Sequence, residues 1–310
     1  MVALRAHRRG GPEVLTVERA PVPVPAAGEV LIEVHAAAIT FDELTWEETW
    51  TRDGADRTPI IPSHEVSGVV AAVAPGVSAF SDGDEVFGLI RFDRDGAAAE
   101  YVTAPAADLA RRPTTVSHVA SAALPLAGLT AWQALVDHAK VTAGERVLVH
   151  GGAGGVGALT VELAGILGAD VTTTVRSDAH DLVLGLGASH VIDTRTTEFD
   201  ASDTRYDVVI DTIGAETMLR SFAVLRPGGR LVTLSAPPPD AVAESHGVRA
   251  TFFIVSPDHA QLTRLANLVD ADRLHVAIAD TFALTDGRAA FESGRAPHRR
   301  PGKTVLVVRG

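Results

Sequence analysis

The chain has 310 residues, no cysteine, and 27 lysines and arginines against 39 aspartates and glutamates, which gives a formal net charge of −12 at pH 7. The length predicts two domains at roughly 150 residues each. The missing cysteines exclude disulfide scaffolds, cysteine zinc ribbons, iron–sulfur proteins and cysteine nucleophiles. The acidic balance, without basic blocks, argues against a nucleic-acid partner.

The N-terminal residues and the apolar runs predict a cytoplasmic protein. Arg5, Arg8 and Arg9 are followed by the proline-rich residues 21–25 with no apolar stretch between them, so no export signal is expected. No uninterrupted apolar run reaches the roughly 18 residues that a membrane span needs. We therefore expect a cytoplasmic location and no membrane partner.

From the start to about Thr114, short apolar runs are separated by Gly, Pro and Asp, a pattern typical of a small barrel or sandwich. Its strands are predicted at residues 30–34, 69–73, 84–88 and 99–102. After Thr114 the spacing of apolar residues becomes helical. Ser117 can cap a helix, and Pro125 interrupts it.

From Arg146 onward, predicted strands and helices alternate, which indicates the βαβ units of a parallel sheet. A glycine-rich turn follows the first of these strands, and Gly168 is a natural stop for the helix after it. Another turn is expected at residues 227–229. The strands are predicted at residues 147–149, 171–175, 206–211 and 230–234. In the tail, a helix is expected around Leu265, and the apolar run 304–308 looks like a strand that returns to the first domain.

The sharpest motif is a G-x-G-x-x-G between the first strand of this region and its helix. Its glycines permit a tight turn at Gly152, close approach of a pyrophosphate at Gly154, and close packing of helix and strand at Gly157. The helix that begins near Gly155 offers free N–H groups and its positive dipole end to phosphate. The motif predicts dinucleotide binding, the alternatives being a structural turn or another nucleotide. The residues assigned to the cofactor are Gly152, Ala153, Gly154, Gly155, Val156 and Gly157.

The end of the next strand indicates which dinucleotide binds. An NAD site usually carries Asp or Glu there to hold the ribose 2′-hydroxyl. This chain has Arg176 and Ser177, with no acid before Asp178. These two residues, with His180 as a third contact, suit the 2′-phosphate of NADP(H). The alternative is that Arg176 is a solvated side chain at a strand end. The missing acid also argues against an S-adenosylmethionine methyltransferase.

Four segments resemble the medium-chain dehydrogenase/reductase superfamily, and within it the zinc-free NADPH:quinone oxidoreductase branch, over essentially the whole chain. They are residues 124–132, 150–157, 225–230 and 301–306. The resemblance implies an α/β protein with two domains and a homodimer. A GroES-like β-rich catalytic domain is expected at residues 1–120 and 256–310. A Rossmann NADP(H)-binding domain, with a doubly wound parallel sheet, is expected at residues 121–255.

The resemblance also assigns further cofactor-binding positions. Those expected near the nicotinamide or in the turn beneath it are Thr130, Ile213, Gly214, Ser235, Ala236, Phe252 and Phe253. The last two belong to a segment, residues 252–254, that also tends to form the dimer seam. Arg176, Ser177 and His180 fall on the 2′-phosphate positions, in agreement with the strand-end argument.

His64-Glu65-x-x-Gly68 resembles the zinc alcohol dehydrogenase signature, in which the histidine is a catalytic zinc ligand. Zinc there needs a cysteine just upstream, where this chain has Ile-Thr-Phe-Asp at residues 39–42, and usually a second thiolate where residues 124–126 lie. The four-cysteine structural zinc lobe is also missing. Because the thiolates are absent, no metal is expected, and His64 is interpreted as a structural or pocket histidine.

Without a Lewis acid, hydride transfer favours electron-poor acceptors whose developing oxyanion can be held by hydrogen-bond donors. Thr40 and His64 are the candidate catalytic donors, and a cofactor ribose hydroxyl or a water molecule are the alternatives. Phe41, Trp46 and Trp50 are candidate walls of the substrate pocket, although the tryptophans could equally cap the small-domain core. The sequence predicts an NADPH-dependent, zinc-independent reductase of a quinone or an α,β-unsaturated carbonyl. The alternatives are a ketone or alcohol oxidoreductase of a biosynthetic pathway and a non-catalytic NADPH-binding redox sensor.

Overall fold

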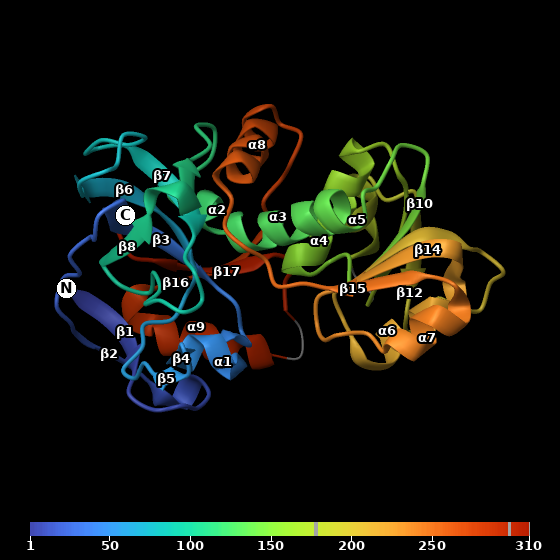
Figure 1. The fold of residues 1–310 in the computed structure, drawn as a ribbon, viewed down its shortest axis with the longest axis horizontal. Helices are drawn as coiled ribbons and strands as arrows, with labels where there is room; N and C mark the ends of the chain where they lie inside the picture. Colours follow the sequence, from blue (N-terminus) through green and yellow to red (C-terminus); the bar gives the residue numbers. More distant parts are fainter. Residues whose placement is uncertain (177–178, 297–298, 310) are drawn as a thin grey trace. The chain divides into compact units, whose positions relative to one another are not determined.

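The computed structural model describes residues 1–176, 179–296 and 299–309. The chain divides into a first unit, Met1–Leu129 with Ser256–Gly310, and a second unit, Thr130–Val255 (Figure 1). The boundary expected at residue 121 lies N-terminal to this division. Among the described residues, no helix combines the length and apolar character that a membrane crossing requires.

A seven-stranded sheet is the centre of the first unit. Its strands, in spatial order, are β16 (Ile278–Ala283), β17 (Lys303–Val307), β3 (Glu29–Ile39), β6 (Glu65–Val73), β7 (Glu85–Leu89) and β9 (Leu109–Arg111), with β8 (Tyr101–Pro105) also paired to β3. Only the contact of β16 with β17 is parallel. The four strands predicted before Thr114 overlap β3, β6, β7 and β8. The predicted run at 304–308 is β17, and it joins this sheet as expected.

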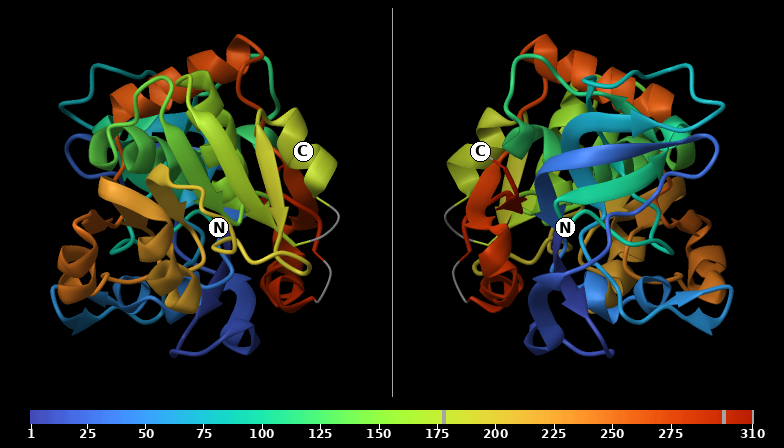
Figure 2. Two further views of the ribbon diagram at one scale, coloured as in Figure 1. Left: turned by 90° about the vertical axis from the view of Figure 1, so that its right-hand side faces the viewer. Right: turned by 90° about the vertical axis from the view of Figure 1, so that its left-hand side faces the viewer.

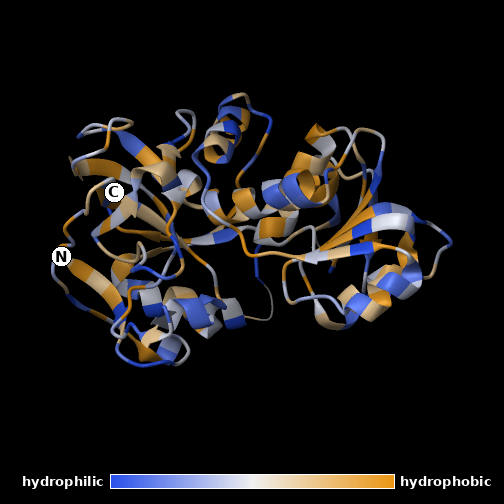
Figure 3. Cartoon of the chain, viewed as in Figure 1, coloured by the Kyte–Doolittle hydropathy of each residue, from blue (hydrophilic) through white to orange (hydrophobic). Residues whose placement is uncertain are grey.

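Short elements complete the first unit. They are the paired strands β1 (Val2–Ala6) and β2 (Leu15–Arg19), the hairpin β4 (Thr51–Arg52) and β5 (Ala55–Asp56), and the helices α1 (Glu47–Trp50), α2 (His118–Ala122), α8 (His259–Asp270) and α9 (Gly287–Glu292). The Ser117 side chain caps α2 by accepting the Ala120 N–H, as predicted. Pro125 ends this segment but begins the next helix, α3 (Pro125–Trp132). In α8, Leu262 and Leu265 face the core, so blue and orange alternate along it (Figure 3).

The second unit is built on a six-stranded, all-parallel sheet in the order β12-β11-β10-β13-β14-β15. The strands are β10 (Arg146–His150), β11 (Asp170–Val175), β12 (His190–Asp193), β13 (Tyr206–Asp211), β14 (Leu225–Thr233) and β15 (Arg249–Phe252), and the left view of Figure 2 shows them side by side. The connecting helices are α4 (Gly155–Ile166), α5 (His180–Gly185), α6 (Ala215–Ser221) and α7 (Asp240–His246). Counted from β10, the order is 3-2-1-4-5-6, the doubly wound arrangement predicted from the sequence.

The burial pattern explains why the sequences of these strands are almost continuously apolar. All six residues of β13 are buried, as are four of five in β10 and five of six in β11, because helices cover both faces of such a sheet. The turn predicted at residues 227–229 lies inside β14 as a bulge. Leu225 pairs with Tyr206 and Arg230 with Val208, so the intervening residues of β14 stand outside the ladder.

Candidate active site

The predicted glycine turn connects β10 to α4 at the carboxyl edge of the parallel sheet. The Gly152 N–H donates to the Thr174 carbonyl (3.0 Å), and the Gly154 N–H donates to the Gly151 carbonyl (2.9 Å), which closes the turn. Helix α4 begins at Gly155 after Gly154, which provides no capping side chain. The first three N–H groups of the helix therefore have neither an intrahelical acceptor nor a cap, and they can receive an anion.

The three glycines of the motif are required for different reasons. A Cβ on Gly152 would lie 2.0 Å from Thr173 Oγ1, and one on Gly157 would lie 2.1 Å from the Gly151 carbonyl oxygen, so the packing of the protein itself imposes both. A Cβ on Gly154 would meet only that same carbonyl, at 3.3 Å. The left-handed residue of the turn is Gly151 (φ 76°), so the tight-turn role expected of Gly152 belongs to its neighbour.

The other predicted nicotinamide positions in this sheet follow the carboxyl ends of its neighbouring strands. Residues 213–214 follow β13, residues 235–236 follow β14, and residues 252–253 lie at the end of β15. Because the strands are parallel, these ends share one edge with the glycine turn. The strand order reverses between β10, which carries the turn, and β13, so the turn and the three strand ends flank the reversal point. Ile213 presents an apolar side chain that is 57% exposed at this edge.

Asp211 supports the 213–214 turn and was not singled out from the sequence. Its fully buried carboxylate accepts the N–H groups of Ile213 (3.1 Å) and Gly214 (3.0 Å) and the hydroxyl of Thr233 (3.1 Å). These bonds tie the end of β13 to β14. An acid that closes an apolar strand just before a glycine could have signalled this role, because such a carboxylate commonly caps the following turn.

The residues predicted for the 2′-phosphate lie after β11, the strand next to β10. Arg176 follows the strand directly and is exposed. His180 begins α5, also exposed, with its Nδ1 3.5 Å from Asp181 Oδ1. Ser177 lies outside the described residues. The side chains of Arg176 and His180 are thus exposed and can contact an anion beside the glycine turn.

Thr130 lies in α3, and Phe253 follows β15. The buried Thr130 hydroxyl has no hydrogen-bond partner among the described residues, and leaving such a group unpaired is costly. The ring of Phe253 lies 4.3 Å from that of His138, centroid to centroid. Open helix N–H groups, the unpaired Thr130 hydroxyl and an exposed Arg176 together fit a phosphorylated dinucleotide.

In the first unit, Thr40 stands at the end of β3 beside a buried ion pair. Its Oγ1 lies 3.3 Å from Lys303 Nζ, and Lys303 is paired with Glu65. The second carboxylate oxygen of Glu65 accepts the N–H of Leu126 (3.0 Å), at the start of α3. Sequence reasoning missed Lys303, because 263 positions separate it from Thr40.

Glu43 is a second buried carboxyl close to this pair. Burial raises its pKa to about 8, although the N–H of Ser63 donates to its Oε1 (2.9 Å) and opposes the shift. Ser63 has φ 73°, a strained left-handed conformation for a residue with a Cβ. Its own hydroxyl donates to the Ala38 carbonyl (2.7 Å). These two bonds hold the backbone that presents the next residue, His64.

His64 is buried against the ring of Phe92. Neither ring nitrogen has a hydrogen-bond partner among the described residues, and burial, with the nearby charge of Arg57, lowers its pKa to about 4. Phe92 packs edge-on against His64 (5.1 Å between centroids), and Trp46 packs edge-on against Phe92 (5.1 Å). Near pH 7 His64 is therefore a neutral imidazole that can form a hydrogen bond but carries no charge.

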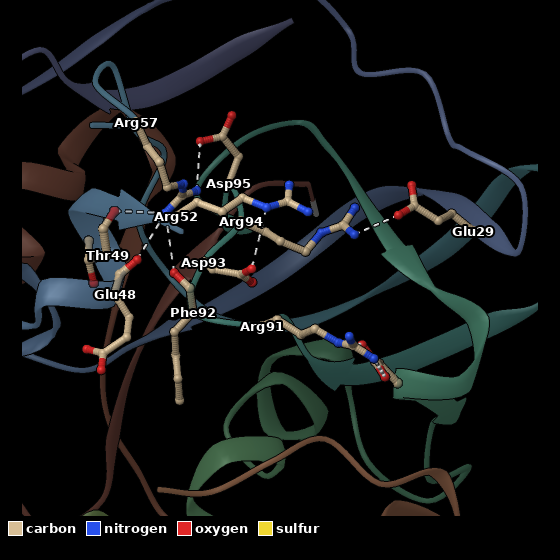
Figure 4. Close-up of polar contacts among 11 residues, drawn as sticks. Glu29, Glu48, Thr49, Arg52, Arg57, Arg91, Phe92, Asp93, Arg94 and Asp95 are labelled. Atoms are coloured by element: carbon tan, nitrogen blue, oxygen red, sulfur yellow. Dashed lines mark hydrogen bonds and ion pairs between the residues drawn. The ribbon is translucent and has the colours of Figure 1, made fainter. Parts of the chain in front are cut away.

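Arg57 fixes the segments that carry these rings. In Figure 4 its guanidinium lies between α1 and the Phe92 backbone, and its Nη1 donates to the carbonyls of Thr49 (2.8 Å), Glu48 (3.3 Å) and Phe92 (3.3 Å). A cavity of about 780 Å³ lies beside this cluster, lined in part by Arg5, Arg52, Arg57 and Arg94. Three of these arginines pair with acids of the same wall, Arg94 with Glu29, Arg52 with Asp93 and Arg57 with Asp95.

The predicted pocket residues separate into two environments. Trp46 and Phe41 are partly exposed, and the Arg299 guanidinium lies 3.9 Å from the Phe41 ring centroid. Trp50 is only 2% exposed, belongs to the core of the first unit, and donates its Nε1–H to the Leu44 carbonyl (2.9 Å). Of the two interpretations of the tryptophans, the core therefore holds for Trp50, and the pocket-wall role of Trp46 stays a prediction.

The residues around His64 do not fit a catalytic zinc ion. The chain has no thiolate, and within residues 1–176, 179–296 and 299–309 no three His, Asp or Glu side chains are grouped closely enough to hold a metal. Two buried acids belong to this region, Glu65 next to His64 and Glu43, which binds the Ser63 N–H. Glu65 is engaged with Lys303 and Leu126.

Comparison with known proteins gives two family models that match the chain. The model described as alcohol dehydrogenase GroES-like domain matches residues 26–114, and the one described as zinc-binding dehydrogenase matches residues 186–306. Human quinone oxidoreductase is 31% identical over 84% of this chain and 83% of its own length. A probable mitochondrial zinc-binding oxidoreductase of Arthroderma benhamiae is 30% identical over 95% of this chain and 93% of its own length.

Several solved structures are similar to this chain over its full length. The quinone oxidoreductase of Coxiella burnetii has a TM-score of 0.91 at 30% identity, covering 100% of this chain and 99% of its own. A mycobacterial protein complexed with NADPH has a TM-score of 0.86 at 30% identity and covers 99% of this chain and 100% of its own. CurK enoyl reductase has a TM-score of 0.86 at 28% identity and covers 99% of this chain and 98% of its own. The chain belongs to the medium-chain dehydrogenase/reductase superfamily, in its quinone oxidoreductase-like branch.

Proposed function

We propose that this oxidoreductase uses NADPH to reduce a quinone or an α,β-unsaturated carbonyl without zinc. The observation that carries the proposal is the edge of the parallel sheet, where an uncapped helix N-terminus and Arg176 follow adjacent strands. A helix N-terminus suits a pyrophosphate, and an arginine in place of an acid suits a 2′-phosphate. The mycobacterial relative solved with NADPH supports the same choice.

When bound, NADPH supplies the hydride. The residues of this chain then have separate tasks: the glycine turn binds the pyrophosphate, Arg176 and His180 contact the 2′-phosphate, and the Thr130 hydroxyl pairs with a polar group on the nicotinamide side. Ile213 gives the ring an apolar neighbour. Positioning of this kind lowers the barrier because the reacting groups are held before reaction.

The acceptor is proposed from the chemistry of the first unit. The Thr40 hydroxyl, with His64 as the second candidate, donates to the acceptor oxygen as negative charge develops there. Neutral donors stabilise that charge less than a Lewis acid, so acceptors that are already electron-poor are favoured. Trp46 and Phe41 provide flat apolar surface for such rings. Names of relatives, quinone oxidoreductase and enoyl reductase, point to the same two classes.

The test is a reductase assay on EDTA-treated protein with NADPH or NADH and with a small quinone, a conjugated enone or a saturated ketone. We expect turnover of quinone or enone with NADPH, unaffected by chelation. Arg176→Ala should raise the KM for NADPH about 10-fold or more, as expected for loss of a charged phosphate contact, and leave NADH unchanged. Arg205→Ala, an exposed arginine of the same unit, is the matched control.

Each other outcome corrects a specific part of the proposal. Activity lost to EDTA and restored by zinc would contradict zinc independence, and equal losses with both nucleotides would contradict the role of Arg176. Turnover of saturated ketones would indicate the ketone or alcohol oxidoreductase. NADPH-dependent thermal stabilisation with no turnover of any acceptor would indicate the redox sensor. A homodimer and a cytoplasmic location remain part of the proposal.

A further inference from the structure

Lys303 and Thr40 meet because two distant strands pair. In the antiparallel ladder of β17 and β3, Thr304 lies opposite Ile39, so the preceding Lys303 lies opposite Thr40. Lys303 is 9% exposed, and its partner Glu65 is 1% exposed. The chain contains only one other lysine, Lys140, against 25 arginines. A buried ammonium at this point is thus a particular feature of the sheet, and its place beside a candidate catalytic hydroxyl calls for a function.

The chemistry of an ammonium group fixes the direction of the hydrogen bond. Lysine has three N–H donors and no acceptor, so at 3.3 Å the Thr40 oxygen accepts from Lys303. The hydroxyl proton of Thr40 is then directed away from Lys303. Among the residues that the structure describes, no acceptor for this proton is recorded. The Thr40 O–H is left as a donor for a group that is not part of the chain.

Lys303 has one direct acidic partner among the described residues. Glu65 pairs with it directly and is held in place by the Leu126 N–H. Glu43, the next acid, keeps its proton near pH 7 because burial raises its pKa to about 8. Lys303 and Glu65 therefore form a one-to-one buried ion pair, with the neutral Glu43 beside it. A hydroxyl that accepts from a cation becomes a stronger donor to the next group in the chain of hydrogen bonds.

We propose that Lys303 is the positioning residue for Thr40: its ammonium orients and polarises the Thr40 hydroxyl toward the acceptor oxygen on which negative charge develops. Lys303 touches neither acceptor nor cofactor and acts only through Thr40. Glu65 holds the ammonium at the strand end. The inference rests on the proposed reductase function and deepens it by assigning the origin of the oxyanion-stabilising hydrogen bond.

A double-mutant cycle tests this role. The chemical variants are Thr40→Val, which removes the hydroxyl, and Lys303→Met combined with Glu65→Gln, which removes both charges together and avoids an unpaired buried carboxylate. The rate of hydride transfer is followed as NADPH consumption in a single turnover at saturating enone. Thr40→Val should lower this rate about 100-fold, the loss typical for one oxyanion donor. The charge-free pair should lower it about 10-fold when Thr40 is present and not at all in the Thr40→Val background.

Controls separate this role from a structural one. Lys140→Met removes the only other lysine, which is exposed, and should leave the rate unchanged. NADPH affinity and melting temperature are measured for every variant, because a folded second unit must still bind the cofactor. Lys303→Arg keeps the positive charge and should recover most of the rate. If the charge-free pair fails to fold, Glu65→Gln alone enters the cycle in its place, because it removes the partner that holds Lys303 and any rate change it makes should also vanish without the Thr40 hydroxyl.

Equal losses in the Thr40 and Thr40→Val backgrounds would overturn the inference, because they would show that Lys303 acts independently of the hydroxyl. Wild-type protein that reduces neither quinone nor enone would remove the proposed function and this inference with it. Wild-type turnover combined with an additive cycle would leave the function standing and remove only the role of Lys303. A rate loss that appears in KM with kcat unchanged would also count against it.

Discussion

Glu43 shows how a single buried carboxyl controls its neighbourhood. It lies in a short turn after β3, is 1% exposed, and accepts the N–H of the strained residue Ser63. Lys303 favours the ionised form, whereas burial, Glu65 and Asp42 favour the neutral form, and burial has the largest effect. The side chain is therefore a neutral acid near pH 7, and it should ionise in the folded protein only above about pH 8.

This raised pKa predicts a pH dependence of stability at Glu43. Between about pH 4.5 and 8 the folded state keeps the proton and the unfolded state releases it, so the free energy of unfolding falls as pH rises. Over that interval the decrease amounts to about 5 kcal/mol at most. Glu43→Gln cannot release a proton, so its stability relative to wild type should increase steadily from pH 5 to pH 8 in urea denaturation.

The matched control for this prediction is Glu48→Gln, an exposed acid in the same segment, which should follow the wild-type profile. Parallel profiles for Glu43→Gln and wild type would show that Glu43 is ionised in the folded state at neutral pH. In that case the charge balance described around Lys303 would need a second positive group. The measurement therefore also checks the electrostatics of the Thr40 site without any assay of activity.

Individual residues were predictable from sequence where a local motif assigns them. The capping role of Ser117 follows from neighbouring residues alone. Lys303 and Phe92 were not predictable in this way, because their roles come from strands and loops that pair across the fold. Trp50 shows the same limit: an indole in a polar loop fits a pocket or a core equally, and only the packing of the first unit distinguishes them.

At the level of elements, the turn between β10 and α4 combines two requirements in one short segment. Gly157 is required by the backbone of Gly151, which a methyl group would approach to 2.1 Å. Gly154 has nearly enough room for a methyl group within the protein, and its importance lies in what approaches from outside. The two glycines of one motif can therefore be separated by experiment.

We expect Gly157→Ala to destabilise the protein by about 1–3 kcal/mol, the usual cost of forcing a methyl group into a packed site. The free energy of unfolding of Gly154→Ala should stay within about 1 kcal/mol of the wild-type value. Its NADPH affinity should still fall at least about 10-fold, because the added methyl blocks the pyrophosphate. Thermal melting with and without NADPH measures both effects. Gly154→Ala protein that binds NADPH like wild type would contradict the phosphate-binding role of the turn.

The strands were predictable where an apolar run has a turn residue at each end, as in β7 and β13. Their limits were less certain where a glycine or proline lies inside the strand. In β14, Pro227 and the two glycines after it predict a turn, but they form a bulge because Tyr206 and Val208 continue to pair on either side of it. Local turn propensity is overridden there by the neighbouring strand of the sheet.

At the level of the whole molecule, the two units differ in how the chain builds them. The second unit is continuous in sequence, and its parallel strands follow one another through connecting helices. The first unit is closed by residues from both ends of the chain, since β16 and β17 join strands formed from the first 111 residues. The apolar run at 304–308 indicated this return, but its neighbours could not be read from its spacing, because register depends on the partner strand.

Ending the chain at Arg300 removes β17 from between β16 and β3. It also removes the fully buried Val305 and Leu306 and leaves the Glu65 carboxylate without Lys303, a loss that typically costs about 3–5 kcal/mol by itself. We expect the first unit to lose its fold while the six strands of the second remain, so limited proteolysis should leave a protected fragment spanning residues 130–255. Ending the chain at Val308 instead loses Arg309 and its partly exposed pair with Glu33, which should cost about 1 kcal/mol or less. Uniform resistance of the chain ended at Arg300 would show that β17 is dispensable, and uniform digestion would show that the second unit depends on the first.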